Sequence, residues 1–151
     1  MTKEQAIRQF ASHVLDETVV ITRYRMSDGF NFSIAVSEAI PRLVIPKNLN
    51  CNFDEEDREF RRNFISRCPL ARGFGNITIA ILHECGHWAT RNLMDFKTYD
   101  KMVEKAHGMK EYMEIPYEHL ATEWAICWLH SPANRKLAKQ FEREYFGYGN
   151  D

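Results

Sequence analysis

Two histidines four residues apart, with a glutamate directly after the first, constrain the fold of this chain most. They lie in residues 82–87, which read Leu-His-Glu-Cys-Gly-His. On a helix, His83 and His87 would be one turn apart, roughly 6 Å along the axis and about 40° around it. Both imidazoles could then reach one tetrahedral metal ion. The spacing therefore predicts a helix over residues 77–93 that supplies two ligands to a zinc site.

Glu84 occupies a different angular position on the same helix. It lies about 100° from His83 and about 60° from His87, so it flanks the expected metal without ligating it. From there a carboxylate can take a proton from an activated water. The opposite face would anchor the helix in the core, and Gly86 would keep it slim beside the metal. That face comprises Ile77, Ile81, Cys85 and Trp88.

Length and composition indicate one globular domain over residues 1–151. Hydrophobic residues make up 44% of the chain, charged residues 27%, and the net charge is -1. No basic excess indicates a nucleic-acid surface, and no apolar run approaches the length of a membrane span. The first residues lack the apolar core of a signal peptide. We therefore expect a cytoplasmic protein whose four cysteines, which form no C-x-x-C pair, are reduced thiols.

The hydrophobic pattern predicts an α+β fold, with a helix first, then a small three-stranded sheet, then further helices. Strands are expected at 18–24 and 30–36, joined as a hairpin by a turn at 27–29. A third strand at 42–46 is expected at a sheet edge because it ends in Pro46, where an extended peptide could pair with it. Helices are expected at 3–17, 52–68, 77–93, 96–106, 115–130 and 131–146.

A third metal ligand must come from elsewhere in the chain. The helix that opens at Pro116 offers Glu118, His119 and Glu123, and small residues beside Glu118 would let it approach the motif helix closely. His107 is a rival third ligand. Together with Gly108 it resembles the His-Gly pair that supplies the third ligand in SprT-type metalloproteins. The extended metzincin motif is excluded because it needs glycine and histidine at positions held here by Thr90 and Leu93.

The stretch His-Glu-Cys-Gly-His, followed about thirty residues later by Glu-His-Leu-Ala-Thr-Glu-Trp-Ala, resembles gluzincin-type metallopeptidases of phage and mobile elements, the ImmA/IrrE-like group. The resemblance covers residues 82–125 and implies a zincin-like helical core carrying H-E-x-x-H. It implies that Glu118 is the third zinc ligand beside His83 and His87, with Glu84 as the base. Thr122 stands where the group usually has asparagine.

The expected function is therefore a zinc-dependent metallopeptidase that hydrolyses a peptide bond in a specific protein partner. Tyr112, Tyr117 and His107 are candidates for stabilising the oxyanion formed from the substrate carbonyl. Two alternatives stay open. One is a zinc-stabilised interaction protein without turnover, whose site would be closed by a fourth protein ligand. The other is an SprT-like metalloprotein. The sequence sets neither the cleavage site nor the oligomeric state.

Overall fold

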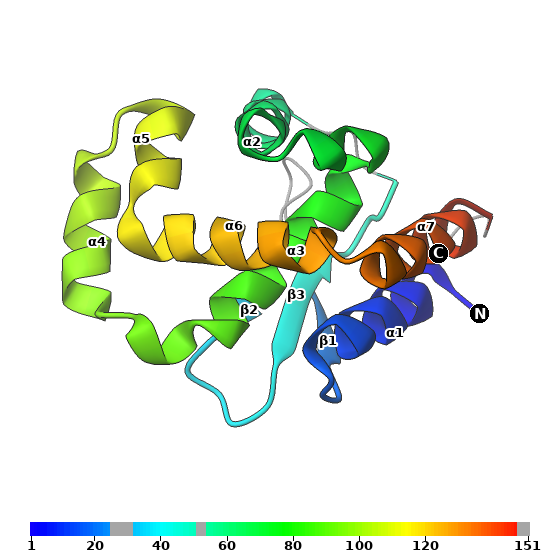
Figure 1. Ribbon diagram of the computed structural model, residues 1–151. Helices are drawn as coiled ribbons and strands as arrows, with labels where there is room; N and C mark the ends of the chain where they lie inside the picture. Colours follow the sequence, from blue (N-terminus) through cyan, green and yellow to red (C-terminus); the bar gives the residue numbers. More distant parts are fainter. Residues whose placement is uncertain (25–31, 51–53, 148–151) are drawn as a thin grey trace.

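The computed structural model describes residues 1–24, 32–50 and 54–147. Within these ranges the chain forms seven α-helices, two short 3-10 helices and one mixed three-stranded sheet (Figure 1). The predicted α+β class is confirmed. The α-helices are α1 (Lys3–Leu15), α2 (Glu55–Arg67), α3 (Asn76–Ala89), α4 (Phe96–Lys105), α5 (Gly108–Glu114), α6 (Pro116–Leu129) and α7 (Pro132–Gly147).

The sheet differs from the predicted arrangement. Its strands are β1 (Val20–Tyr24), β2 (Ser33–Ala35) and β3 (Arg42–Pro46), in the order β1-β3-β2. β3 is parallel to β1 and antiparallel to β2, so the expected hairpin of the first two strands is wrong. The turn predicted at 27–29 lies outside the described residues.

The expectation that residues 42–46 form an edge strand is also wrong, because β3 is central. Leu43 and Ile45 are fully buried, and the central position covers their side chains most completely. Pro46 is the last residue of β3, where its missing N–H interrupts nothing, and the next donor, the Lys47 N–H, bonds the carbonyl of Tyr24 at 2.8 Å. A docked peptide at β3 is therefore excluded.

Capping residues set the starts of the first two helices. Thr2 and Gln5 form a capping box at α1, and Asp54 and Asp57 form another at α2. α1 ends where Asp16 adopts the left-handed conformation, with φ 53°. The helices predicted at 3–17 and 52–68 are thus confirmed, but they are shorter than predicted, at Lys3–Leu15 and Glu55–Arg67. Residues 51–53 lie outside the described ranges.

The later helices mostly follow the prediction. The motif helix ends earlier than expected, at Ala89, and a 3-10 turn (Arg91–Leu93) follows it. Another 3-10 helix (Pro69–Gly73) lies between α2 and α3. α5 was not predicted. No helix of the described residues is long and apolar enough to cross a membrane.

α3 and α6 cross at a close approach that only glycine permits. A Cβ added at Gly86 would lie 2.9 Å from the Cα of Ala121 and closer still to its carbonyl oxygen. Real Cβ atoms essentially never come this near to backbone, so the absence of a side chain at Gly86 sets the distance between the helices. Figure 1 shows α6 crossing in front of α3 near the middle of the molecule.

Two pairs of helices flank this crossing at the two ends of the molecule (Figure 1). α1 and α7 pack side by side at one end, where the rings of Phe10 and Phe141 stack with centroids 4.5 Å apart. α4 and α5 lie at the other end. No residue of α4 is buried, and α4 packs less closely on its neighbours than the other described α-helices do.

Candidate metal centre

α3 presents the two motif histidines to the interior. His83 and His87 are 2% and 7% exposed, and their rings meet edge to face with centroids 4.7 Å apart. The predicted core face of the helix is confirmed, since each of its four residues is buried. Burial also raises the pKa of the Cys85 thiol, which keeps it protonated and disfavours it as a metal ligand.

α6 brings Glu118 to both histidines. Its Oε1 lies 2.8 Å from Nε2 of His83 and 3.0 Å from Nε2 of His87, and the residue is only 1% exposed. Burial disfavours the charge of Glu118, but the hydrogen bonds from the two imidazoles more than offset it, so its pKa lies well below the usual range. A buried carboxylate therefore stays ionised between two rings.

These three atoms fit a metal centre by their chemistry. Two imidazole nitrogens and one carboxylate oxygen converge, which is the donor set of catalytic zinc sites of the His₂Glu type. In a tetrahedral zinc site such atoms would be about 3.4 Å apart, so the ligands would separate by a few tenths of an ångström from their hydrogen-bonded positions. Three such ligands are one fewer than a tetrahedral zinc ion takes.

Glu84 lies beside the same cluster. Donor atoms of His83, Glu84 and His87 all lie within 4.8 Å of one another. The Glu118 carboxylate lies at hydrogen-bond distance from both Nε2 atoms, so it is the better placed of the two glutamates to act as third ligand. Glu84 lies to the side of the three donor atoms. Burial raises the pKa of Glu84 to about 7, while the charge of His87 and the backbone N–H of Ile34 oppose that rise.

The two histidines are held by different neighbours. Nδ1 of His83 lies 3.0 Å from Oγ1 of Thr122, which is one turn after Glu118 on α6. Such a contact fixes the ring orientation of a metal-binding histidine. Nδ1 of His87, in contrast, is buried without a hydrogen-bond partner among the described residues. Its ring instead lies against Tyr117, with centroids 4.5 Å apart.

Tyr99 of α4 completes the surroundings of Glu118. Its hydroxyl donates a 2.5 Å hydrogen bond to Oε2 of Glu118, the oxygen that does not contact the histidines. Burial, together with the Glu118 charge, raises the pKa of Tyr99, so the hydroxyl keeps its proton. The sequence reasoning missed this residue. Its only signal was an apolar stripe on α4, where Phe96, Tyr99 and Val103 recur at helical spacing.

The rival third ligands lie elsewhere. His107 is exposed at the start of α5, where its backbone N–H bonds the Glu111 carboxylate. Glu123 is 47% exposed and forms an ion pair with Arg67. Neither side chain belongs to the cluster.

Of the three oxyanion candidates, the structure brings Tyr112 to the site. Tyr112 lines the same cavity as His83 and Glu84. The hydroxyl of Tyr117 is engaged, because it donates a 2.7 Å hydrogen bond to the carbonyl of His87. His107 does not line the cavity. Burial raises the pKa of Tyr112, so its hydroxyl remains a donor.

The cluster opens into a cavity of about 410 Å³. α2 forms one wall, and α4, α5 and the residues between them form the other, with α3 and Glu118 of α6 at the base. Phe60 on the α2 wall contacts the ring of His83 edge to face, at a centroid distance of 4.9 Å. A molecule that enters the cavity could therefore contact Glu84 and Tyr112.

Together these contacts define a class of site: two imidazoles and one carboxylate converging at the base of an open cavity, with a second carboxylate alongside. Comparison with known proteins adds no closer identity. No protein-family model, curated protein or solved structure matches the chain.

Proposed function

We propose that this chain is a zinc-dependent metallopeptidase of gluzincin type that hydrolyses a peptide bond in a specific protein partner. The observation that carries the proposal is the position of Glu118, whose Oε1 lies 2.8 and 3.0 Å from the two histidine Nε2 atoms. A second carboxylate, Glu84, lies beside them and faces the cavity.

Each residue has a role in this proposal. His83, His87 and Glu118 hold the zinc ion, which would polarise the scissile carbonyl and acidify water at the site. Glu84 takes the proton from the attacking water and hands it to the leaving amine. Tyr112 donates a hydrogen bond to the oxyanion that develops from the carbonyl. Thr122 and Tyr99 orient His83 and Glu118.

Metal analysis tests the ligand set. The purified protein should contain about one zinc per chain, and His83→Ala, His87→Ala and Glu118→Ala should each lose most of it. His107→Ala and Glu123→Ala are matched controls, because each removes a rival ligand that lies outside the cluster, and both should keep the zinc. Unchanged zinc content in both motif-histidine variants would refute the metal site.

Glu84→Gln tests the reaction. This variant should keep zinc and lose peptide cleavage by several orders of magnitude, because base and metal act as one unit. Cleavage is followed on a mixture of internally quenched peptides of random sequence. A Gln variant that cuts at the normal rate would show that Glu84 is not the base.

A zinc-stabilised interaction protein is the second candidate. One observation favours it: Glu84 lies close enough to the histidines to act as a fourth ligand and close the site. The two candidates make opposite predictions for Glu84→Gln, since a closed site would lose zinc affinity and an open one would keep it. The SprT-like alternative has no such support, because His107 is exposed.

A further inference from the structure

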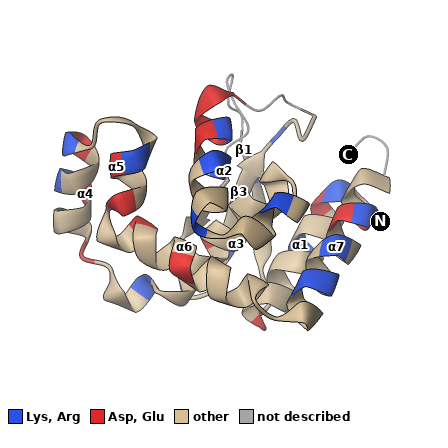
Figure 2. Ribbon diagram, turned by 45° about the horizontal axis from the view of Figure 1, so that its top comes forward, with Lys and Arg blue, Asp and Glu red and all other residues tan. Residues whose placement is uncertain are grey.

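The cavity above the metal cluster has a charge that the proposed reaction does not explain. Three carboxylates from the start of α2 line it, namely those of Glu56, Asp57 and Glu59, and no lysine or arginine among the described residues does. Figure 2 shows acidic residues gathered at the start of α2. Zinc would offset the charges of Glu84 and Glu118, but not those of Glu56 and Glu59.

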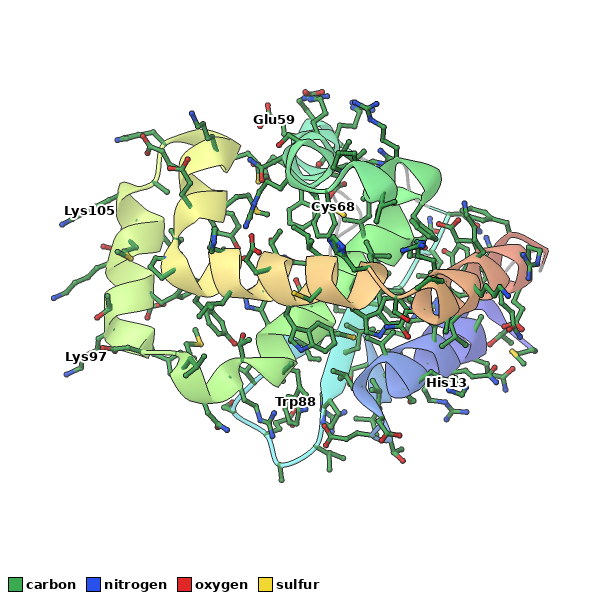
Figure 3. The ribbon with its side chains drawn as sticks, in the orientation of Figure 1. His13, Glu59, Cys68, Trp88, Lys97 and Lys105 are labelled. Carbon is green, nitrogen blue, oxygen red and sulfur yellow. The ribbon has the colours of Figure 1, made fainter. Side chains whose placement is uncertain are left out.

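Helix capping accounts for only part of this acidic wall. Asp57 accepts a hydrogen bond from the backbone N–H of Asp54, and carboxylates in a first turn are favoured by the helix dipole. Glu59 lies beyond the first turn and gains little from either effect. It lies on the part of α2 that borders α5 (Figure 3), and it is half-buried.

The basic residues of α2 do not pair with Glu56 or Glu59. Arg62 pairs with Glu55 at 2.7 Å, and Arg58 also contacts Glu55. Glu56 and Glu59 form no ion pair with described residues. Charges of one sign in a walled cavity focus their field, so the cavity favours a positively charged group.

Apolar side chains line the remaining wall. Phe60 lies next to His83, and Val103 and Met109 face the cavity from α4 and α5. Val103 is 38% exposed although it is a large apolar residue within the stripe of α4. A peptide side chain that covers this surface gains the free energy of apolar burial.

We infer that the cavity selects a peptide segment that carries lysine or arginine beside a large apolar residue, within two residues of the scissile bond. The cleavage part of this inference rests on the proposed function. The preference for a positively charged side chain depends only on the residues that line the cavity. The carboxylates of Glu56 and Glu59 contact the basic side chain, and Phe60, Val103 and Met109 contact the apolar one.

Defined peptides test the inference on the zinc-loaded full chain. Internally quenched twelve-residue peptides carry a central leucine or alanine, with both neighbours set to lysine, arginine, glutamine or glutamate and neutral flanks. The kcat/KM for lysine or arginine peptides should exceed that for glutamate peptides by about tenfold or more. Leucine should exceed alanine severalfold. Higher salt should reduce the charge preference.

Charge reversal on α2 provides the matched comparison. Glu59→Lys should lower the preference for basic peptides. The double variant with Glu56→Lys and Glu59→Lys should abolish or invert that preference. Glu144→Lys makes the same change on α7, at the opposite end of the molecule from α4 and α5 (Figure 1), and should leave the preference unchanged. Zinc content should be normal in all three.

Binding separates this inference from the proposed function. The same peptides, labelled with a fluorophore, are titrated against zinc-loaded Glu84→Gln protein and followed by anisotropy. Cleavage without charge preference overturns the inference and leaves the peptidase standing. Charge-selective binding without cleavage by the native chain supports the inference and overturns the peptidase. Neither cleavage nor binding of any peptide overturns both.

Discussion

The hydroxyl of Tyr99 donates a 2.5 Å hydrogen bond to Oε2 of Glu118, while Oε1 of the same carboxylate lies between the two motif histidines. One helix that is otherwise loosely packed thus determines which oxygen of Glu118 faces the proposed metal. A hydrogen bond to the distal oxygen favours binding through one oxygen, and it keeps the carboxylate from rotating.

Tyr99→Phe is expected to weaken zinc binding about tenfold, because partners of metal ligands contribute that much in comparable sites. Chelator competition measures the affinity. Tyr145→Phe is the matched control, since it removes a hydroxyl from a buried tyrosine of α7 that donates a long hydrogen bond, 3.4 Å, to the carbonyl of Leu49. Equal affinities for Tyr99→Phe and the native chain would show that the bond does not support the site.

Thr122→Val should also weaken zinc binding, by about tenfold, because it removes the hydrogen-bond partner of His83 Nδ1 without changing the volume much. Thr122→Ser keeps the hydroxyl and should retain most of the affinity. The contact would lose its assigned role if valine and serine at this position gave the same zinc affinity.

Gly86→Ala should destabilise the protein by about 2 kcal/mol or more, because the new methyl group overlaps the backbone of Ala121 and forces α3 and α6 apart. The separation should also move Glu118 away from the histidines and reduce zinc content. Urea denaturation and metal analysis measure the two effects. Gly147→Ala is the control, since a Cβ there meets nothing within 4 Å, and wild-type stability of Gly86→Ala would contradict the close approach.

Burial of Glu84 predicts a pH dependence in the metal-free protein. Its pKa is about 7 in the folded chain against an ordinary value of 4.5, so the folded state binds this proton more tightly than the unfolded state does. Stability should therefore fall as pH rises from about 4.5 to about 7 and then level off, with a loss on the order of 3 kcal/mol from this group.

Glu84→Gln cannot ionise and should lack that part of the pH dependence. Urea denaturation with a chelator present, at pH 5 and pH 8, compares the two proteins. Glu144→Gln, a change at a half-buried position on α7 far from Glu84 (Figure 1), should behave as the native chain does. Parallel curves for native protein and Glu84→Gln would show that Glu84 does not carry the predicted shift.

The sequence predicted the parts of the site that depend on local spacing. Four-residue spacing on a helix placed His83 and His87 together, and the small residues at 86 and 121 indicated that α3 and α6 approach each other. The choice of Glu118 came from the family resemblance. The contact of Thr122 with His83 then follows from the same crossing, because Thr122 is one turn from Glu118.

Non-local pairing was not predictable in the same way. The hairpin was inferred from the closeness of two strands in sequence, but strand order depends on which segment buries most apolar surface, and that segment is β3. Tyr99 was missed for a similar reason. Its distance to Glu118 depends on the path of the chain through α4 and α5, and no periodicity in sequence reports that path.

The weak packing of α4 has a thermodynamic consequence. No α4 residue is buried, and the hydroxyl of Tyr99 bonds Glu118. The interaction with this proposed metal ligand therefore supplies part of the free energy that holds α4 against the rest of the molecule. Thermodynamic linkage is reciprocal. If the docked position of α4 increases metal affinity, bound metal increases the free energy of local opening of α4 by the same amount. Amide hydrogen exchange of α4 should then be slower when metal is bound, so exchange in this surface helix would measure the occupancy of the metal site.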